Sequence, residues 1–200
     1  MKPWNERYAA PGFLFGKQPA DFLVASADYL HPGQTALAVA DGEGRNSVYM
    51  AEQGLAVTAI DNSPVAIEKA QGLAAERGVS VDFREVDVLG WTWPEGTFDL
   101  VVGIFIQFAP PEVRPALFAG MKQALKPGGT LLLHGYRPEQ IEYATGGPPH
   151  AENMYTEALL REAFGDMEIL RLEAYDKEIQ EGEGHSGMSA LIDLVARKPV

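Results

Sequence analysis

Cysteine is absent from this chain of 200 residues, and its absence excludes several chemistries at once. Without thiol groups the chain has no disulfide framework, no thiolate zinc site, no cysteine nucleophile and no thiol redox chemistry. We also expect no metal site built from other residues. The function must therefore rest on other side chains and on bound small molecules.

Positive charge is scarce, because 16 lysines and arginines face 28 aspartates and glutamates, for a net charge of −12. Binding to a nucleic-acid backbone or to an anionic membrane surface depends on clustered lysine and arginine. We expect neither partner, and the oligomeric state, monomer or dimer, is left open. Much of the excess lies in residues 152–183, where ten acidic residues face three basic ones and predict a solvated face.

Long apolar runs are also missing, since the longest strong one, residues 100–106, has the length of a strand. The first seven residues lack the apolar stretch of a signal peptide, so we expect a cytoplasmic protein. The length favours a single domain over residues 1–200, and 46% hydrophobic residues suffice for its core.

Short β-rich runs alternate with longer helical ones along the chain. Such alternation with short connections predicts an α/β fold, with a doubly wound, mostly parallel, seven-stranded sheet covered by helices on both faces. The last two strands have no helix between them and predict an antiparallel edge hairpin joined by a glycine-rich acidic loop. The predicted strands are 35–40, 56–60, 81–86, 98–105, 130–134, 167–175 and 189–197, and the predicted helices are 19–30, 47–53, 64–77, 111–125 and 156–164.

Ligands of such sheets bind at the carboxyl ends of the strands, so the residues at the ends of the first three strands are candidates for a binding site. Gly42 and Gly44 follow the first strand and let the backbone approach a ligand, whose anionic end can meet the next helix N-terminus. Asp61 ends the second strand, 61 − 44 = 17 residues after Gly44, and can accept both hydroxyls of a ribose. At the end of the third strand, Asp87 can take the exocyclic amine of an adenine while Val88 packs on its ring. Together they predict an adenosine-containing ligand.

Three adenosine ligands are compared with this pattern. A dinucleotide fingerprint requires glycine or alanine where this chain has Ser47, which weakens a nicotinamide cofactor, and no P-loop motif occurs. An adenosine joined to an amino acid, whose carboxylate would sit at the helix N-terminus, fits better and describes S-adenosylmethionine. An NAD-dependent oxidoreductase and a non-catalytic cofactor-binding module stay open as alternatives.

These residues resemble the class I S-adenosylmethionine-dependent methyltransferases, over nearly the whole chain. The motifs that match in order are residues 36–46, the strand 57–61, Asp87-Val88, residues 98–102 and residues 125–131. More narrowly, the chain resembles a small bacterial branch related to tellurite-resistance and thiopurine methyltransferases. That likeness rests on the N-terminal residues Trp4, Arg7-Tyr8 and 15–19, on Gly42-Glu43-Gly44-Arg45-Asn46, and on Glu183-Gly184-His185-Ser186-Gly187.

The resemblance implies a Rossmann-like methyltransferase core over residues 31–200, with residues 1–30 as an N-terminal lid and helix. S-adenosyl-L-methionine is the implied cofactor. The implied cofactor-binding residues are Trp4, Phe15, Gly16, Ala40, Asp41, Gly42, Gly44, Arg45, Asn46, Asp61, Asn62, Asp87, Val88 and Ile104.

The chain departs from the family pattern at three places. Ala38 and Ala40 stand where an acidic residue and the first glycine are usual, so the carboxylate that helps hold the methionine amino group is missing or supplied by Asp41. Phe15-Gly16 replaces the common Tyr-Gly and removes a hydroxyl.

The sequence argues against several classes of methyl acceptor. Residues 104–111 lack the N/D-P-P-Y/F motif of exocyclic-amine methyltransferases, and the missing cysteines exclude base methylation through a thiol adduct and cysteine-relayed arsenic methylation. A small molecule is left, such as a thiol, selenium or tellurium species. The candidate catalytic residues, as proton handlers, are His185 in the terminal loop, His134 at the end of the fifth strand and Tyr143.

Overall fold

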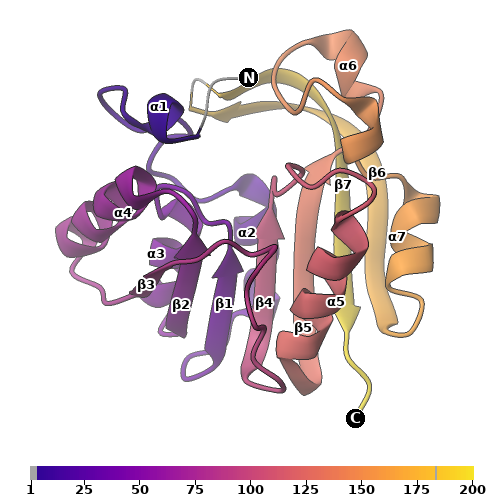
Figure 1. The fold of residues 1–200 in the computed structure, drawn as a ribbon, viewed down its shortest axis with the longest axis horizontal. Coiled ribbons are helices and arrows are strands. Elements are labelled where there is room, and N and C mark those ends of the chain that lie inside the picture. The colour runs from indigo at the N-terminus through magenta and orange to yellow at the C-terminus, as the bar shows by residue number, and fades with distance from the viewer. Residues whose placement is uncertain (1–3, 183) are drawn as a thin grey trace.

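In the computed structural model, which describes residues 4–182 and 184–200, one seven-stranded sheet has the strand order β3-β2-β1-β4-β5-β7-β6 (Figure 1). The first five strands run parallel, whereas β7 is antiparallel to both β5 and β6. This confirms the predicted α/β fold with an antiparallel edge hairpin. The strands are β1 (Thr35–Val39), β2 (Ala56–Asp61), β3 (Asp82–Glu85), β4 (Phe98–Ile104), β5 (Leu125–Tyr136), β6 (Glu168–Glu181) and β7 (His185–Arg197).

Helices cover both faces of the sheet, and the alternation of strand side chains explains why. On β4, Val101 packs into one apolar core with α5 and α7, whereas Leu100 and Val102 pack into a second core with α2 and α3. In Figure 1, α5 crosses in front of the sheet while α2 and α3 lie behind it. The helices are α1 (Trp4–Tyr8), α2 (Asp21–Ala25), α3 (Arg45–Glu52), α4 (Pro64–Arg77), α5 (Arg114–Ala124), α6 (Gln140–Tyr143) and α7 (Glu157–Ala163), with 3₁₀ turns at Ala27–Tyr29 and Ala151–Asn153.

Local capping sets the bounds of the predicted helices. The Ser63 hydroxyl accepts from the Ala66 amide, Pro64 takes the first helical position, and Gly78 ends α4 in the left-handed conformation. Thr156 caps α7 in the same way through the Leu159 amide. The predicted helix 19–30 is instead broken into α2 and a 3₁₀ turn at Ser26, whose hydroxyl accepts a hydrogen bond from Arg171.

The edge hairpin is longer than the sequence predicts. β6 and β7 pair from Glu168↔Arg197 to Glu181↔His185, so most of the expected acidic loop is strand. Its polar residues lie on an exposed edge strand, where burial no longer imposes the apolar alternation that marks a strand in a sequence. Figure 1 shows the far ends of β6 and β7 curving over the sheet toward α1.

Two sequence predictions fall partly on residues that are not described. Glu183, in the terminal motif, and residues 1–3, in the predicted N-terminal lid, lie outside the described residues. Within the described part of the chain, no helix is both long and apolar enough to span a bilayer.

Candidate functional site

A cavity of ≈ 440 Å³ lies at the carboxyl ends of the parallel strands, above the point where the strand order reverses between β1 and β4. Its volume is within the range of small-molecule sites, about 300–1,000 Å³. The predicted cofactor residues that line it are Trp4, Phe15, Ala40, Asp41, Gly42, Arg45, Asn46, Asp61, Asn62, Asp87, Val88 and Ile104.

The other two predicted cofactor residues, Gly16 and Gly44, do not line the cavity but shape the backbone around it. A Cβ on Gly44 would lie 2.6 Å from the Cβ of Ala70, so glycine is needed for α3 to approach α4. Gly16 has a φ of +73° and packs against Gly182 of the edge hairpin.

Asp61 organises the first loop from the end of β2. The Gly42 amide donates to its Oδ2 atom (2.8 Å) and the Ser63 amide donates to its Oδ1 atom (2.9 Å). Burial raises the pKa of this carboxyl group, and the amide hydrogen bonds act against the rise. The side chain is thus fixed in place, and its remaining lone pairs can accept hydrogen bonds from hydroxyl groups of a ligand in the cavity.

Asp41 lies beside it and accepts hydrogen bonds from the Ser47 amide and hydroxyl. Burial, with a further contribution from the charge of Asp61, raises its pKa to about 6. A cation bound in the cavity would stabilise the ionised form of Asp41 and would lower this pKa.

The pKa of Asp41 predicts a specific pH dependence of stability. Because the folded-state pKa lies above the unfolded value, the contribution of Asp41 is fully present below about pH 4 and is lost as the pH rises through about 6. Asp41→Asn, which stays neutral, should therefore gain about 1–2 kcal/mol relative to wild type between about pH 4.5 and 7.5. Urea unfolding of both proteins across this range measures the difference, and parallel pH curves would contradict the prediction.

Two non-glycine residues next to the cavity have left-handed backbone conformations. They are Ala40 after β1, with a φ of +49°, and Phe105 after β4, with a φ of +57°. Such conformations are strained for residues with a Cβ and concentrate at functional sites. Ala40 occupies the position where the resembled family usually has glycine, so the loop keeps the glycine-like conformation without the glycine.

The polar residues of Gly42-Glu43-Gly44-Arg45-Asn46 tie the first loop to distant segments. Glu43 accepts from the Leu14 amide (2.7 Å) and from the Lys69 ammonium group (2.9 Å). Asn46 accepts from the Ala20 amide (3.0 Å), and Arg45 forms a buried ion pair with Glu181 at the end of β6 (2.7 Å). Sequence reasoning assigned no role to Glu43, although an acid between two loop glycines was a visible signal.

The N-terminal segment, residues 4–16, packs against the cavity with its aromatic side chains. Trp4 stacks on Tyr8 (5.5 Å between ring centroids), and Phe15 lies edge-on to His185 (4.4 Å). A Cβ on Gly42 would meet the Tyr8 hydroxyl at 2.8 Å, so α1 contacts the glycine loop directly. The segment forms one wall of the cavity, as a covering element would.

Of the candidate catalytic residues, His185 lines the cavity. It is the first residue of β7 rather than part of a loop, and the centroid of its ring lies 4.0 Å from the ring centroid of Phe105. Burial, followed by the charges of Arg45, His134 and Arg7, holds its pKa well below the usual value. Its imidazole is therefore neutral near pH 7, and among the described residues its Nδ1 atom has no hydrogen-bond partner.

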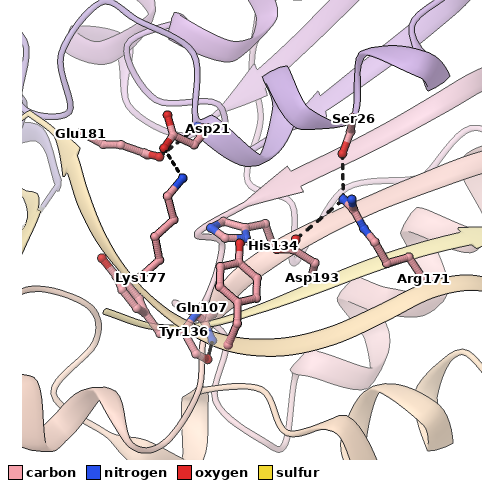
Figure 2. A network of polar contacts seen from close by, with 10 residues as sticks. Asp21, Ser26, Gln107, His134, Tyr136, Arg171, Lys177, Glu181 and Asp193 are labelled. Carbon is pink, nitrogen blue, oxygen red and sulfur yellow. Dashed lines mark hydrogen bonds and ion pairs between the residues drawn. The ribbon is translucent and has the colours of Figure 1, made fainter. Parts of the chain in front are cut away.

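The structure does not bring His134 or Tyr143 into the cavity. His134 is 2% exposed, stacks on Phe22 and has its Nδ1 atom 2.7 Å from Asp193 Oδ1, within the network in Figure 2. Tyr143 lies on the surface and donates its hydroxyl to Asp176 (3.0 Å). Their side chains are engaged elsewhere.

Gln107 is a site residue that sequence reasoning missed. Its buried amide donates to the Tyr136 carbonyl (2.7 Å) and accepts from the Tyr136 amide (2.7 Å). This pairing fixes the segment after β4 against the end of β5, so that Phe105 and Tyr136 form a common wall. The signal was a lone glutamine in an otherwise apolar run.

Comparison with known proteins adds to this geometry. Residues 36–129 match a family model described as a methyltransferase domain. Two solved structures share the fold. One belongs to a study of the conversion of a disulfide bond into a thioacetal group during echinomycin biosynthesis (TM-score 0.79, 19% identity, 98% of this chain and 88% of that chain). The other is TehB from Haemophilus influenzae (TM-score 0.73, 22% identity, 88% and 61%).

The family model covers just under half of this chain, and the two solved structures, at 19% and 22% identity, show that the fold is shared. Among curated relatives, 2-heptyl-1-hydroxyquinolin-4(1H)-one methyltransferase from Mycobacteroides abscessus is 31% identical over 94 residues, which are 46% of this chain and 41% of the relative. The first curated relatives are matched over 39% of their length.

Proposed function

We propose that this protein is an S-adenosylmethionine-dependent methyltransferase that acts on a small-molecule acceptor. The observation that carries the proposal is the convergence of three strand-end carboxylates, those of Asp41, Asp61 and Asp87, with the glycine loop in one cavity. Such a site suits a ligand that has a ribose, an adenine and a positive charge. The methyltransferase-domain match over residues 36–129 supports it independently.

The residues of the cavity fit this cofactor. Asp61 would accept the ribose hydroxyls, Asp87 and Val88 would hold the adenine, and the loop of Asp41 and Gly42 would face the amino-acid end. The Tyr8 hydroxyl leaves no space for a Cβ on Gly42, so glycine at this position lets α1 pack closely against the loop. A positively charged ligand beside Asp41 would stabilise the ionised form of this buried carboxyl group.

S-adenosylmethionine, when bound, supplies a methyl carbon activated by its sulfonium. The tasks left to the protein are to exclude water and to align the acceptor. The N-terminal segment contributes Trp4 and Phe15 to a wall that also contains Phe105 and Tyr136. Aromatic ring faces of this kind attract a cation and shield it from water. His185, neutral and buried among them, is the one catalytic candidate that faces the reacting space.

For the acceptor, we propose a thiol, selenium or tellurium species, and we place the chain in the branch that resembles tellurite-resistance and thiopurine methyltransferases. The absence of the exocyclic-amine motif from residues 104–111 supports this choice. The fold shared with TehB is compatible with the branch. Soft nucleophiles of this class react without strong acid or base catalysis, which suits an aromatic, largely apolar wall.

Titration calorimetry with S-adenosylhomocysteine and with NAD tests the cofactor assignment. We expect saturable binding of S-adenosylhomocysteine and none of NAD, and the reverse result would support an oxidoreductase. A turnover assay with S-adenosylmethionine over thiols, selenite, tellurite, amines and small acids then tests the acceptor. Tight cofactor binding without product from any of them would favour a non-catalytic binding module.

A further inference from the structure

The charged residues that line the cavity are divided between its two halves. The carboxylates of Asp41, Asp61 and Asp87 lie at the carboxyl ends of β1, β2 and β3, respectively, and we call this side the donor half. The acceptor half is formed by residues after β4 and β5, by the start of β7 and by the N-terminal segment. Its charged side chain is that of Arg7, and a second cation, Arg45 from the start of α3, lines the cavity where it pairs with Glu181 of the edge hairpin, in a protein whose net charge is −12.

Arg7 is held in place by aromatic rings rather than by a carboxylate. Its guanidinium carbon lies 4.3 Å from the ring centroid of Trp4 and 5.9 Å from that of Phe15. Among residues 4–182 and 184–200, no ion pair is formed with Arg7. Its charge is therefore available to a ligand in the cavity.

Two buried nitrogen atoms of other cavity-lining residues also have no hydrogen-bond partner among the described residues. They are Nη1 of Arg45, whose Nη2 atom pairs with Glu181, and Nδ1 of His185. Both residues line the cavity and are 6% exposed. A buried polar group without a partner is unfavourable, so two of them in one wall indicate a ligand that completes their hydrogen bonds.

The groups around His185 keep its imidazole ring uncharged. Arg7 from α1, Arg45 from α3 and His134 from β5 each disfavour its protonation, as does burial. Glu181 of β6 lies opposite it in the β6–β7 ladder and is paired with Arg45. Within the described residues, the acceptor half therefore presents the positive charge of Arg7, which has no ion-pair partner there, and neutral or already paired groups.

We propose that the acceptor binds in this half as an anion, with its charge held by Arg7 and by the free nitrogens of Arg45 and His185, and that it reacts without a general base. This inference rests on the proposed function. In the transfer, the acceptor's lone pair forms the bond to the methyl carbon. The carbon–sulfonium bond breaks, and its electron pair neutralises the sulfur. A thiolate, a selenolate or an oxyanion satisfies this balance, since no proton is left to remove.

The pH dependence of turnover tests whether the anion reacts. Two acceptors are compared, an aromatic thiol and an alkyl thiol, of which the aromatic thiol ionises at clearly lower pH. We expect the acid limb of kcat/KM to move with the ionisation of each acceptor. The same limb for both acceptors would assign the titration to a protein group and would overturn the inference.

Arg7→Gln tests the recognition of the charge. We expect the KM for the thiol to rise about tenfold or more, with the affinity for S-adenosylhomocysteine within about twofold of wild type, and Arg7→Lys to restore most of the loss. Arg137→Gln is the matched control, because Arg137 pairs with Asp176 outside the cavity and its loss should change neither value. An unchanged KM in Arg7→Gln would overturn the inference.

A binding measurement keeps this test separate from turnover. Benzenesulfonate, an anion that is a poor methyl acceptor, is titrated into the protein saturated with S-adenosylhomocysteine. Wild type should bind it and Arg7→Gln should bind it at least about tenfold more weakly, whereas no binding or equal binding would contradict the inference. Failure of the proposed function would appear earlier, as a lack of S-adenosylhomocysteine binding.

Discussion

Replacing Arg45 by methionine should lower the free energy of unfolding by about 3–5 kcal/mol, the largest effect that we expect from a single substitution. Arg45 is the ion-pair partner of Glu181 (2.7 Å), and both side chains are more than nine-tenths buried. Without the guanidinium group, the Glu181 carboxylate would keep the Asp21 amide as a donor (3.1 Å) but would lose its counter-charge. Urea unfolding near neutral pH measures the loss.

A double substitution tests whether the lost stability comes from the unpaired charge of Glu181 or from lost packing contacts. In Arg45→Met combined with Glu181→Met the buried charge is also removed, and most of the lost stability should return. Arg84→Met is the matched control, because its pair with Asp82 has both side chains more than half exposed and should contribute less than about 1 kcal/mol. If Arg45→Met lost no more than Arg84→Met, the buried pair would not be important for stability.

Asp61→Ala should weaken the binding of S-adenosylhomocysteine by about 2–3 kcal/mol, or roughly 30-fold to 150-fold. Two charge-assisted hydrogen bonds to the ribose would be lost. In addition, the carboxylate also accepts from the Gly42 amide, so its removal frees the glycine loop that shapes the pocket. Titration calorimetry gives the affinity directly.

The control for Asp61 is a carboxylate with comparable structural bonds far from the cavity. Asp99 lies near the opposite end of the sheet, where it binds the Thr35 amide and the Lys126 ammonium group. Asp99→Ala should therefore lower stability but leave the affinity for S-adenosylhomocysteine unchanged. An unchanged affinity in Asp61→Ala would mean that the ribose is held elsewhere.

The donor half of the cavity could be predicted from the sequence because topology alone assembles it. In a parallel sheet the carboxyl ends of β1, β2 and β3 lie at one edge, so Asp41, Asp61 and Asp87 meet whatever the details of packing. The predicted helix 64–77 is equally local, because Ser63 caps its first turn and Gly78 ends it in the left-handed conformation.

The acceptor half depends on contacts that no local pattern encodes. His134 and His185 look alike as single histidines beside strands, but strand register turns the first toward Asp193 and the second toward the cavity. Gln107 forms hydrogen bonds with the backbone of Tyr136. Arg45 pairs with Glu181 because the edge hairpin curves back toward it. Such pairings follow from the tertiary arrangement and not from spacing along the chain.

The contacts between the edge hairpin and the N-terminal segment can form only late in synthesis, because the two segments lie near opposite ends of the chain. The Asp21 amide and its acceptor Glu181 are 160 residues apart, and the Gly184 amide donates to the Leu14 carbonyl (3.1 Å). At synthesis rates of about 5–20 residues per second, the glycine loop emerges on the order of 10–30 s before these partners exist. The residues of the donor half are therefore made long before the acceptor half is complete, and the cavity cannot be enclosed until the hairpin has been made.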